Sequence, residues 1–60
     1  MKIKGKVVEI GMLESGHGDG YKIQSDDGLM IEVTGISRDV LQNNNFLFDD
    51  VVITFERKDA

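Results

Sequence analysis

The sequence predicts an all-β fold with one short helix, built as a small barrel of four to five antiparallel strands. Three observations predict this fold class. Apolar and polar residues alternate in several short runs, turn-forming residues separate these runs, and a single segment carries helix signals. A period of two is typical of strands with one buried face. A length of 60 residues predicts one domain, residues 1–60, with a thin core.

The first run, residues 2–13, alternates but changes phase in its middle. A regular strand cannot turn both phases towards one face, because its side chains alternate strictly. One extra residue near Val7-Val8 restores the pattern, so the sequence predicts a β-bulge there. A long bulged strand can bend across two faces of a small barrel. The residues expected to point inward are Ile3, Gly5, Val7, Val8, Ile10 and Met12.

A hairpin is the clearest signal in the sequence. A three-residue loop at 26–28 places Ile23 opposite Ile31, and Tyr21 opposite Val33. These pairs keep one face apolar, whereas a two-residue loop would place an isoleucine opposite a glutamate. The longer loop also puts its glycine at the left-handed position that a type I turn followed by a bulge requires. We therefore predict two antiparallel strands with this register.

A short helix is predicted after this hairpin. Ser37 can cap its N-terminus, and Ile36 and Leu41 are spaced as a hydrophobic staple. Val40 and Leu41 would then close one end of the barrel. Asparagines at 43–45 are expected to end the helix, because asparagine tolerates the left-handed conformation.

The last run of residues is apolar and predicts the final strand. Phe46–Phe48 can form a further short strand, and Asp49-Asp50 forms a turn. Val51, Ile53 and Phe55 then share the inward parity. The resulting order of elements suits an OB-like or an SH3-like barrel.

Four stretches carry a resemblance to a known family. They are Lys4–Glu9, Tyr21–Ile23 with the Gly28 turn into Leu29–Val33, Gly35–Arg38, and Phe48–Phe55. Through them the chain resembles the OB-fold of the smallest bacterial translation initiation factor and its RNA-binding relatives. That family usually has Gly-Asp where this chain has Asp49-Asp50, continues into a fifth strand, and is more basic. The resemblance implies that Tyr21 and Arg38 face nucleic acid, whereas the hairpin register turns Tyr21 inward.

Composition narrows the classes of function. Eleven acidic and seven basic residues give a net charge of −4, which disfavours non-specific binding to phosphate backbones. The lack of cysteine excludes disulfides and thiolate metal sites. The N-terminus interleaves lysine with isoleucine, unlike a signal peptide, and no apolar run reaches the roughly 20 residues needed to cross a bilayer. We expect a cytoplasmic protein with no membrane partner.

Catalytic and cofactor sites are not expected. His17, the single histidine, lies in the glycine-rich run 16–20, which cannot hold it in a fixed geometry. The same glycines join two strands and do not open a helix, unlike phosphate-binding loops. The aspartates lack the spacing of a calcium-binding loop. The sequence therefore predicts a protein that is not an enzyme, with no cofactor, no metal and no small-molecule substrate.

Basic residues provide the candidate binding surface. Lys2, Lys4 and Lys6 share the outward parity, and the basic residues at the other end of the chain extend this stripe if the first and last strands pair. Lysines on an edge strand also discourage aggregation, which is a structural explanation for the same pattern. With aspartates in the turns, we expect one basic and one acidic end. The candidate residues for binding nucleic acid or a partner are Lys2, Lys4, Lys6, Lys22, Arg38, Arg57 and Lys58.

Two functions remain open at this level. The first is a non-catalytic interaction module, an adaptor or inhibitor, that binds a protein partner or a second copy through an open sheet edge. The acidic balance and a barrel that lacks a closing strand favour it. The alternative is an OB-type module that binds single-stranded RNA or DNA, which the lysine stripe favours.

Overall fold

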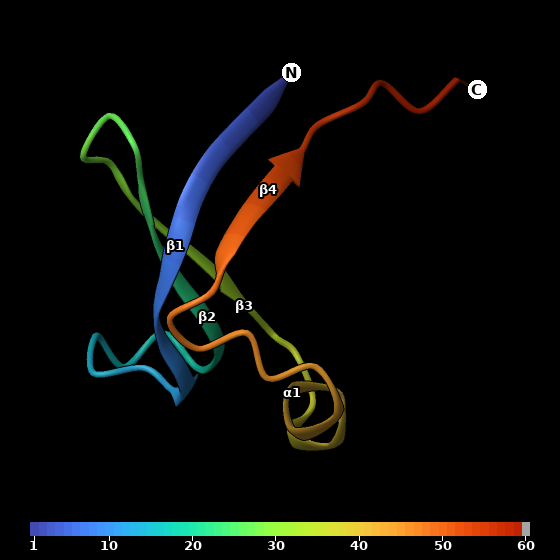
Figure 1. Ribbon diagram of the computed structural model, residues 1–60. Coiled ribbons are helices and arrows are strands. Elements are labelled where there is room, and N and C mark those ends of the chain that lie inside the picture. Colours follow the sequence, from blue (N-terminus) through green and yellow to red (C-terminus); the bar gives the residue numbers. More distant parts are fainter. Residues whose placement is uncertain (60) are drawn as a thin grey trace.

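The computed structural model describes residues 1–59 and consists of one antiparallel sheet with a short helix (Figure 1). Along the chain the elements are β1 (Lys2–Met12), β2 (Asp19–Ser25), β3 (Met30–Thr34), α1 (Arg38–Asn43) and β4 (Asp50–Thr54). The strand order in the sheet is β3-β2-β1-β4. The predicted fold class, mostly β with one short helix, is confirmed to this extent.

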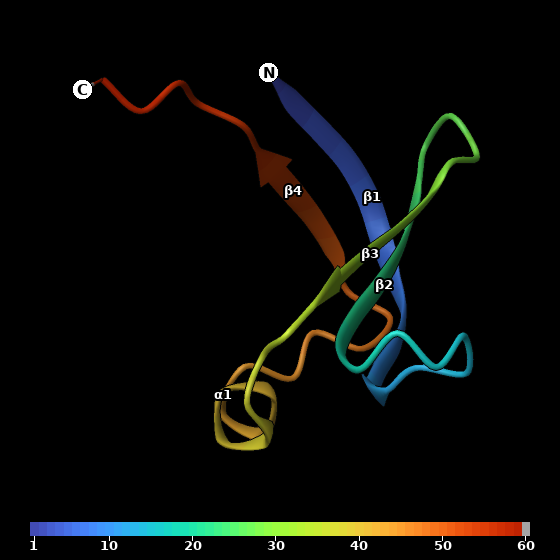
Figure 2. The ribbon, with the colours of Figure 1, turned by 180° about the vertical axis from the view of Figure 1, so that it is seen from behind.

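The predicted bulge in β1 is confirmed. Val7 pairs with Ile23 of β2, and the next paired residue is Glu9, so the intervening Val8 is the extra residue. The first part of β1 also pairs with β4, from Lys2 to Lys6. One long, bent strand therefore carries β2 on one side and β4 on the other. In Figure 2, β3 and β2 lie in front and β4 lies behind, as the twist of the sheet requires.

The hairpin has the predicted register. Ile23 pairs with Ile31, and Tyr21 pairs with Val33. Gly28 has a φ of +90°, and its N–H donates to the carbonyl of Ser25 (2.9 Å). This glycine therefore takes the left-handed turn position that the three-residue loop requires.

The helix α1 begins at the predicted cap and ends at the predicted asparagines, but its last residues are not left-handed. The Ser37 hydroxyl accepts a hydrogen bond from the N–H of Val40 at 3.5 Å. Asn44, at the C-cap, has a φ of −132°, so the predicted left-handed ending is wrong. Its side-chain amide instead donates to the carbonyl of Val40 (2.9 Å), which satisfies one of the free carbonyls of the last turn. Within residues 1–59, no helix has the length and apolar character to cross a membrane.

The core consists of few side chains. The apolar residues that are almost fully buried are Val7, Leu13, Ile23 and Leu41. Three residues predicted to point inward, Met12, Val40 and Phe55, are 73%, 48% and 51% exposed. Met12 and Phe55 lie at or beyond the ends of paired strands, where no second layer covers them. These three predictions are therefore wrong.

The sheet is open, and the predicted closure into a barrel is not formed within residues 1–59. β3 and β4 are its two edges and do not pair with each other. The accessible surface is 4738 Å², against about 3,900 Å² for a folded monomer of 6.7 kDa. The radius of gyration is 11.9 Å, against about 10.4 Å for a domain of this length. The segment after β4 is extended (Figure 1), and several large apolar side chains are exposed; both add to the accessible surface.

Candidate functional site

The predicted lysine stripe lies on the outer face of the sheet. Lys2, Lys4 and Lys6 are exposed, and none forms an ion pair within residues 1–59. The residues of β4 that face them are, in order, Thr54, Val52 and Asp50. Val52 is 55% exposed, so an apolar residue stands beside the middle of the stripe.

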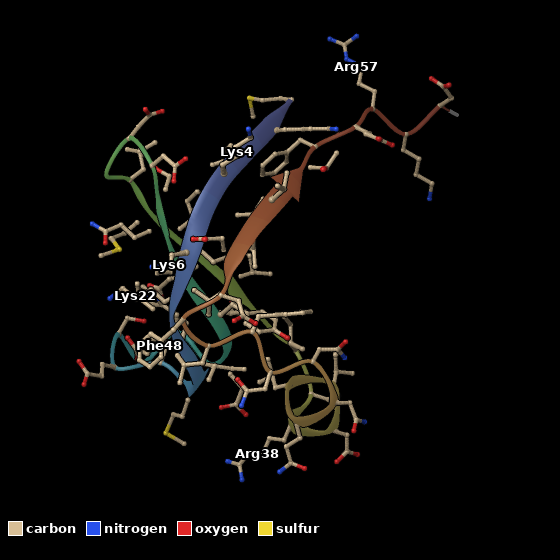
Figure 3. The ribbon with its side chains drawn as sticks, in the orientation of Figure 1. Lys4, Lys6, Lys22, Arg38, Phe48 and Arg57 are labelled. Carbon is tan, nitrogen blue, oxygen red and sulfur yellow. The ribbon has the colours of Figure 1, made fainter. Side chains whose placement is uncertain are left out.

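Arg57 and Lys58 follow β4. Figure 3 shows Arg57 at the same end of the molecule as Lys4, which agrees with the predicted basic end. The backbone N–H of Asp26, however, donates to the carbonyl of Lys4 (2.9 Å). The aspartates of the β2–β3 turn therefore lie beside the lysine stripe, and the prediction of a separate acidic end is wrong. The register of β2 on β1 explains this, because it places the hairpin turn next to the start of β1.

The other two candidate residues each have an acidic partner; Lys22 lies next to Lys6, and Arg38 lies at the other end of the molecule (Figure 3). The Lys22 ammonium lies 3.9 Å from a carboxylate oxygen of Glu9, its neighbour across β1 and β2. The Arg38 guanidinium lies 3.4 Å from the carboxylate of Asp19, beside α1 (Figure 3). The structure therefore does not bring all the candidate residues into one basic surface.

A hydrogen-bonded cluster that the sequence did not predict lies on β3. The Ser15 hydroxyl donates to a carboxylate oxygen of Glu32 (2.5 Å), and His17 Nδ1 lies 3.1 Å from the same oxygen. The hydrogen bond from Ser15, followed by the hydrogen bond and charge of His17, lowers the pKa of Glu32 from its usual value. His17 is 69% exposed, as expected for a loop histidine, but it also has an acidic partner that the sequence did not predict. That partner, Glu32, lies on β3 and is distant from His17 in the sequence, so no local pattern could identify it.

The edge of β4 is the least protected part of the sheet. β4 pairs with β1 on one side, and its other side has no strand within residues 1–59. Edge strands are commonly protected by a lysine, a proline or a central charge. β4 has none of these, since its sequence is DVVIT and its acid stands at the first position. An edge of this kind can accept a further strand.

A tight turn stands at the start of β4, where a short strand was predicted at 46–48. The N–H of Asp49 donates to the carbonyl of Phe46 (2.8 Å), which closes a four-residue turn. The N–H of Phe48 donates to the carbonyl of Val7, and the N–H of Val7 donates to the carbonyl of Asp49. Phe48 and Asp49 thus both oppose Val7, and this arrangement of two residues against one is a β-bulge. The predicted strand is wrong because the chain must turn sharply here to enter β4.

Phe48 occupies an unusual backbone position in this turn. Its φ is +66°, and every other residue with positive φ within 1–59 is a glycine. A type II turn joined to a bulge normally has glycine at this position, because a Cβ costs about 1–2 kcal/mol in the left-handed region. The ring is 68% exposed, so burial in the core does not offset this cost.

Comparisons of the chain with protein-family models, with curated proteins and with solved structures give no significant match. The resemblance to an OB-fold therefore stays a prediction. The evidence on function lies in the geometry of the sheet, its two edges and the residues on them.

Proposed function

We propose that this chain is a non-catalytic protein-interaction module that pairs an extended strand with the free edge of β4. We further propose that this strand is β4 of a second copy. The observation that carries the proposal is the open edge of β4, with an exposed valine at its centre and no charge there to oppose pairing. Backbone hydrogen bonds along such an edge provide affinity, and side chains of alternating direction provide specificity.

The sequence of β4 is complementary to itself. An antiparallel pair with its two-fold axis at Val52 places Val52 opposite Val52 of the second copy. The same register sets Val51 opposite Ile53, and Asp50 opposite Thr54. Apolar pairs of this kind stabilise a sheet, and no like charges face each other. A two-fold contact of one patch with its own copy is the commonest form of oligomer.

The exposed area leaves surface for a contact with another chain. A single copy exposes about 800 Å² more than a folded monomer of its mass, and the extended segment after β4 contributes part of this excess. Closure into an OB-like or SH3-like barrel would need a further strand between β3 and β4. In the proposed pair, β4 of the second copy takes the edge that such a strand would use.

The lysine stripe supports single-stranded nucleic acid as the other class of ligand. The pairing of Lys22 with Glu9 and of Arg38 with Asp19 weakens this reading, since each cation already has a carboxylate oxygen within 3.9 Å. The experiment that follows also distinguishes nucleic-acid binding from strand pairing.

The experiment measures mass by sedimentation equilibrium over a range of concentrations. Val52→Lys places like charges opposite each other at the proposed axis, and Met30→Lys is the matched control on β3, because both residues are 55% exposed. We expect the native chain and Met30→Lys to dimerise and Val52→Lys to stay monomeric. A native chain that is monomeric at every concentration contradicts the proposal. If that monomer also binds a short fluorescent oligothymidylate in low salt, nucleic acid is the ligand.

A further inference from the structure

We infer that Phe48, Lys6 and Lys22 form a second docking surface, the Phe48 surface, beside β1. The partner that it fits is an acidic peptide segment with an apolar side chain between its carboxylates. This inference goes beyond the proposed function, because Figure 3 shows the ring on the side of the molecule away from the free edge of β4. The Phe48 surface therefore stays exposed when the β4 edges of two copies pair.

The backbone of Phe48 indicates that its side chain is retained for a reason other than folding. Five glycines take the left-handed conformation elsewhere within residues 1–59, whereas Phe48 takes it in the turn before β4, with a φ of +66°. A glycine would make the same turn with less strain. Residues held in strained conformations cluster at binding sites, where the strain serves the function. The ring is therefore the feature that needs an explanation.

Packing within the chain does not provide this explanation. Phe46, two residues earlier, packs on Tyr21 with ring centroids 6.1 Å apart. Phe48 takes part in no aromatic pair within residues 1–59, and it is 68% exposed. A phenylalanine can bury roughly 150–250 Å² of surface against a partner. The ring is thus free to act as the apolar anchor of a contact with another chain.

Two lysines lie beside the ring. The N–H of Phe48 donates to the carbonyl of Val7 (2.8 Å), which is the residue after Lys6. Lys22 approaches from the other side of β1, where it pairs with Glu9 just past the bulge. Figure 3 shows Lys6, Lys22 and Phe48 together along β1, in agreement with these contacts. An apolar centre with a charged rim is the common arrangement of a protein–protein interface.

Carboxylates next to these lysines narrow the class of partner. Glu9 lies 3.9 Å from the Lys22 ammonium, and Asp50 faces Lys6 across β1 and β4. Nucleic acid has a negative charge on every nucleotide and would bring phosphates close to both carboxylates. A peptide can instead place its carboxylates only where the lysines stand, with an apolar side chain over the ring. The net charge of −4 also favours a peptide over a nucleic acid.

The test is a heteronuclear NMR titration of the native chain with the peptide Gly-Glu-Thr-Leu-Thr-Glu-Gly. The two glutamates and the leucine of this peptide share one face when it is extended, because side chains alternate along a strand. We expect its binding to shift the amide signals of the Phe48 surface, and we expect no shift with a control peptide that has lysine in place of glutamate. A peptide that does not bind, or that shifts only the signals of β4, overturns the inference. The second result would mean that the peptide pairs with the free edge, as the proposed function allows.

Phe48→Gly removes the anchor and keeps the turn. It should raise the peptide dissociation constant by about tenfold or more. It should also raise the folding equilibrium constant, measured by urea unfolding, by about threefold, because the strain relieved exceeds the added chain entropy of glycine. Phe55→Ser is the matched control, since Phe55 is a 51% exposed phenylalanine that follows β4, and it should change the dissociation constant by less than about twofold. A Phe48→Gly chain that binds as tightly as the native chain, or that is less stable, overturns the inference.

The charges are tested by combining Lys6→Gln with Lys22→Gln. The double variant should raise the peptide dissociation constant by about fivefold at low salt, and its affinity should depend less on salt than that of the native chain. Lys2→Gln, near the far end of β1, is the control and should have an effect below about twofold. An unchanged dissociation constant in the double variant contradicts the role of the lysines. A native chain that never dimerises removes the proposed function and leaves the peptide result to decide this inference.

Discussion

The two edges of this sheet differ in what they offer to another strand. The outward row of β3 has a carboxylate at its centre, Glu32, which Ser15 and His17 hold in place. The outward row of β4 has Val52 at its centre, exposed and without a charge. A symmetric pairing of β3 about its centre would place two Glu32 carboxylates opposite each other, which destabilises a sheet. The same pairing of β4 meets no such repulsion.

A single charge can therefore decide which edge of a small sheet is available to another strand. Both edges have unpaired backbone groups, and both have exposed apolar side chains. The difference lies in the central outward residue and in the turn that leads into each strand. Gly28 turns the chain into β3 without strain, whereas Phe48 turns it into β4 at a cost.

The largest expected effect comes from a change that weakens the contact between β2 and β3. A Cβ on Gly20 would lie 1.8 Å from the carbonyl oxygen of Val33 on β3. Gly20→Ala should therefore cost about 3 kcal/mol of unfolding free energy, measured by urea denaturation. Gly16→Ala, which meets no atom within 4 Å but has a φ of +80°, should cost about 1 kcal/mol. Equal stability of the two variants would contradict the close approach of β3 to β2.

An intermediate effect concerns the pH dependence of stability at the β3 edge. The folded-state pKa of Glu32 is lowered, mainly by the hydrogen bond from Ser15. A lowered carboxyl pKa stabilises the fold above its unfolded value of 4.5, and this stability is lost as the pH falls through the folded pKa. The urea midpoint should therefore drop as the pH is lowered from about 6 to about 3, which is roughly the range over which carboxylates titrate. Glu32→Gln should show a smaller drop, and an unchanged drop would show that other carboxylates cause it.

The smallest expected effect concerns the ion pair beside α1. Arg38 and Asp19 link the start of α1 to the start of β2, with 73% and 28% of their side chains exposed. Exposed pairs contribute little, so Arg38→Ala should change the unfolding free energy by about 0.5 kcal/mol or less. High salt should reduce the difference further, because it screens exposed charges. A loss well above 1 kcal/mol, on the order of a buried interaction, would mean that Arg38 does more than form this pair.

Local patterns accounted for much of the fold. The hairpin register, the bulge near Val7 and the Ser37 cap follow from rules that act over a few neighbouring residues, and all three are confirmed. The outward direction of the lysine stripe was predictable for the same reason, since parity along a strand decides it. The turn at 46–48 was not predictable, because an apolar run followed by acidic residues does not indicate that a phenylalanine adopts the left-handed backbone conformation.

Some features of the candidate site likewise follow from the local pattern, and others follow from tertiary contacts. By itself, the sequence determined which side chains share a face, because the pleat of a strand alternates whatever surrounds it. Only the tertiary structure decided which strands became edges, that Glu32 gained partners from a distant loop, and that Phe48 was left exposed. These outcomes depend on contacts between residues far apart in the chain, and a pattern of period two holds no information about which strand lies next to which.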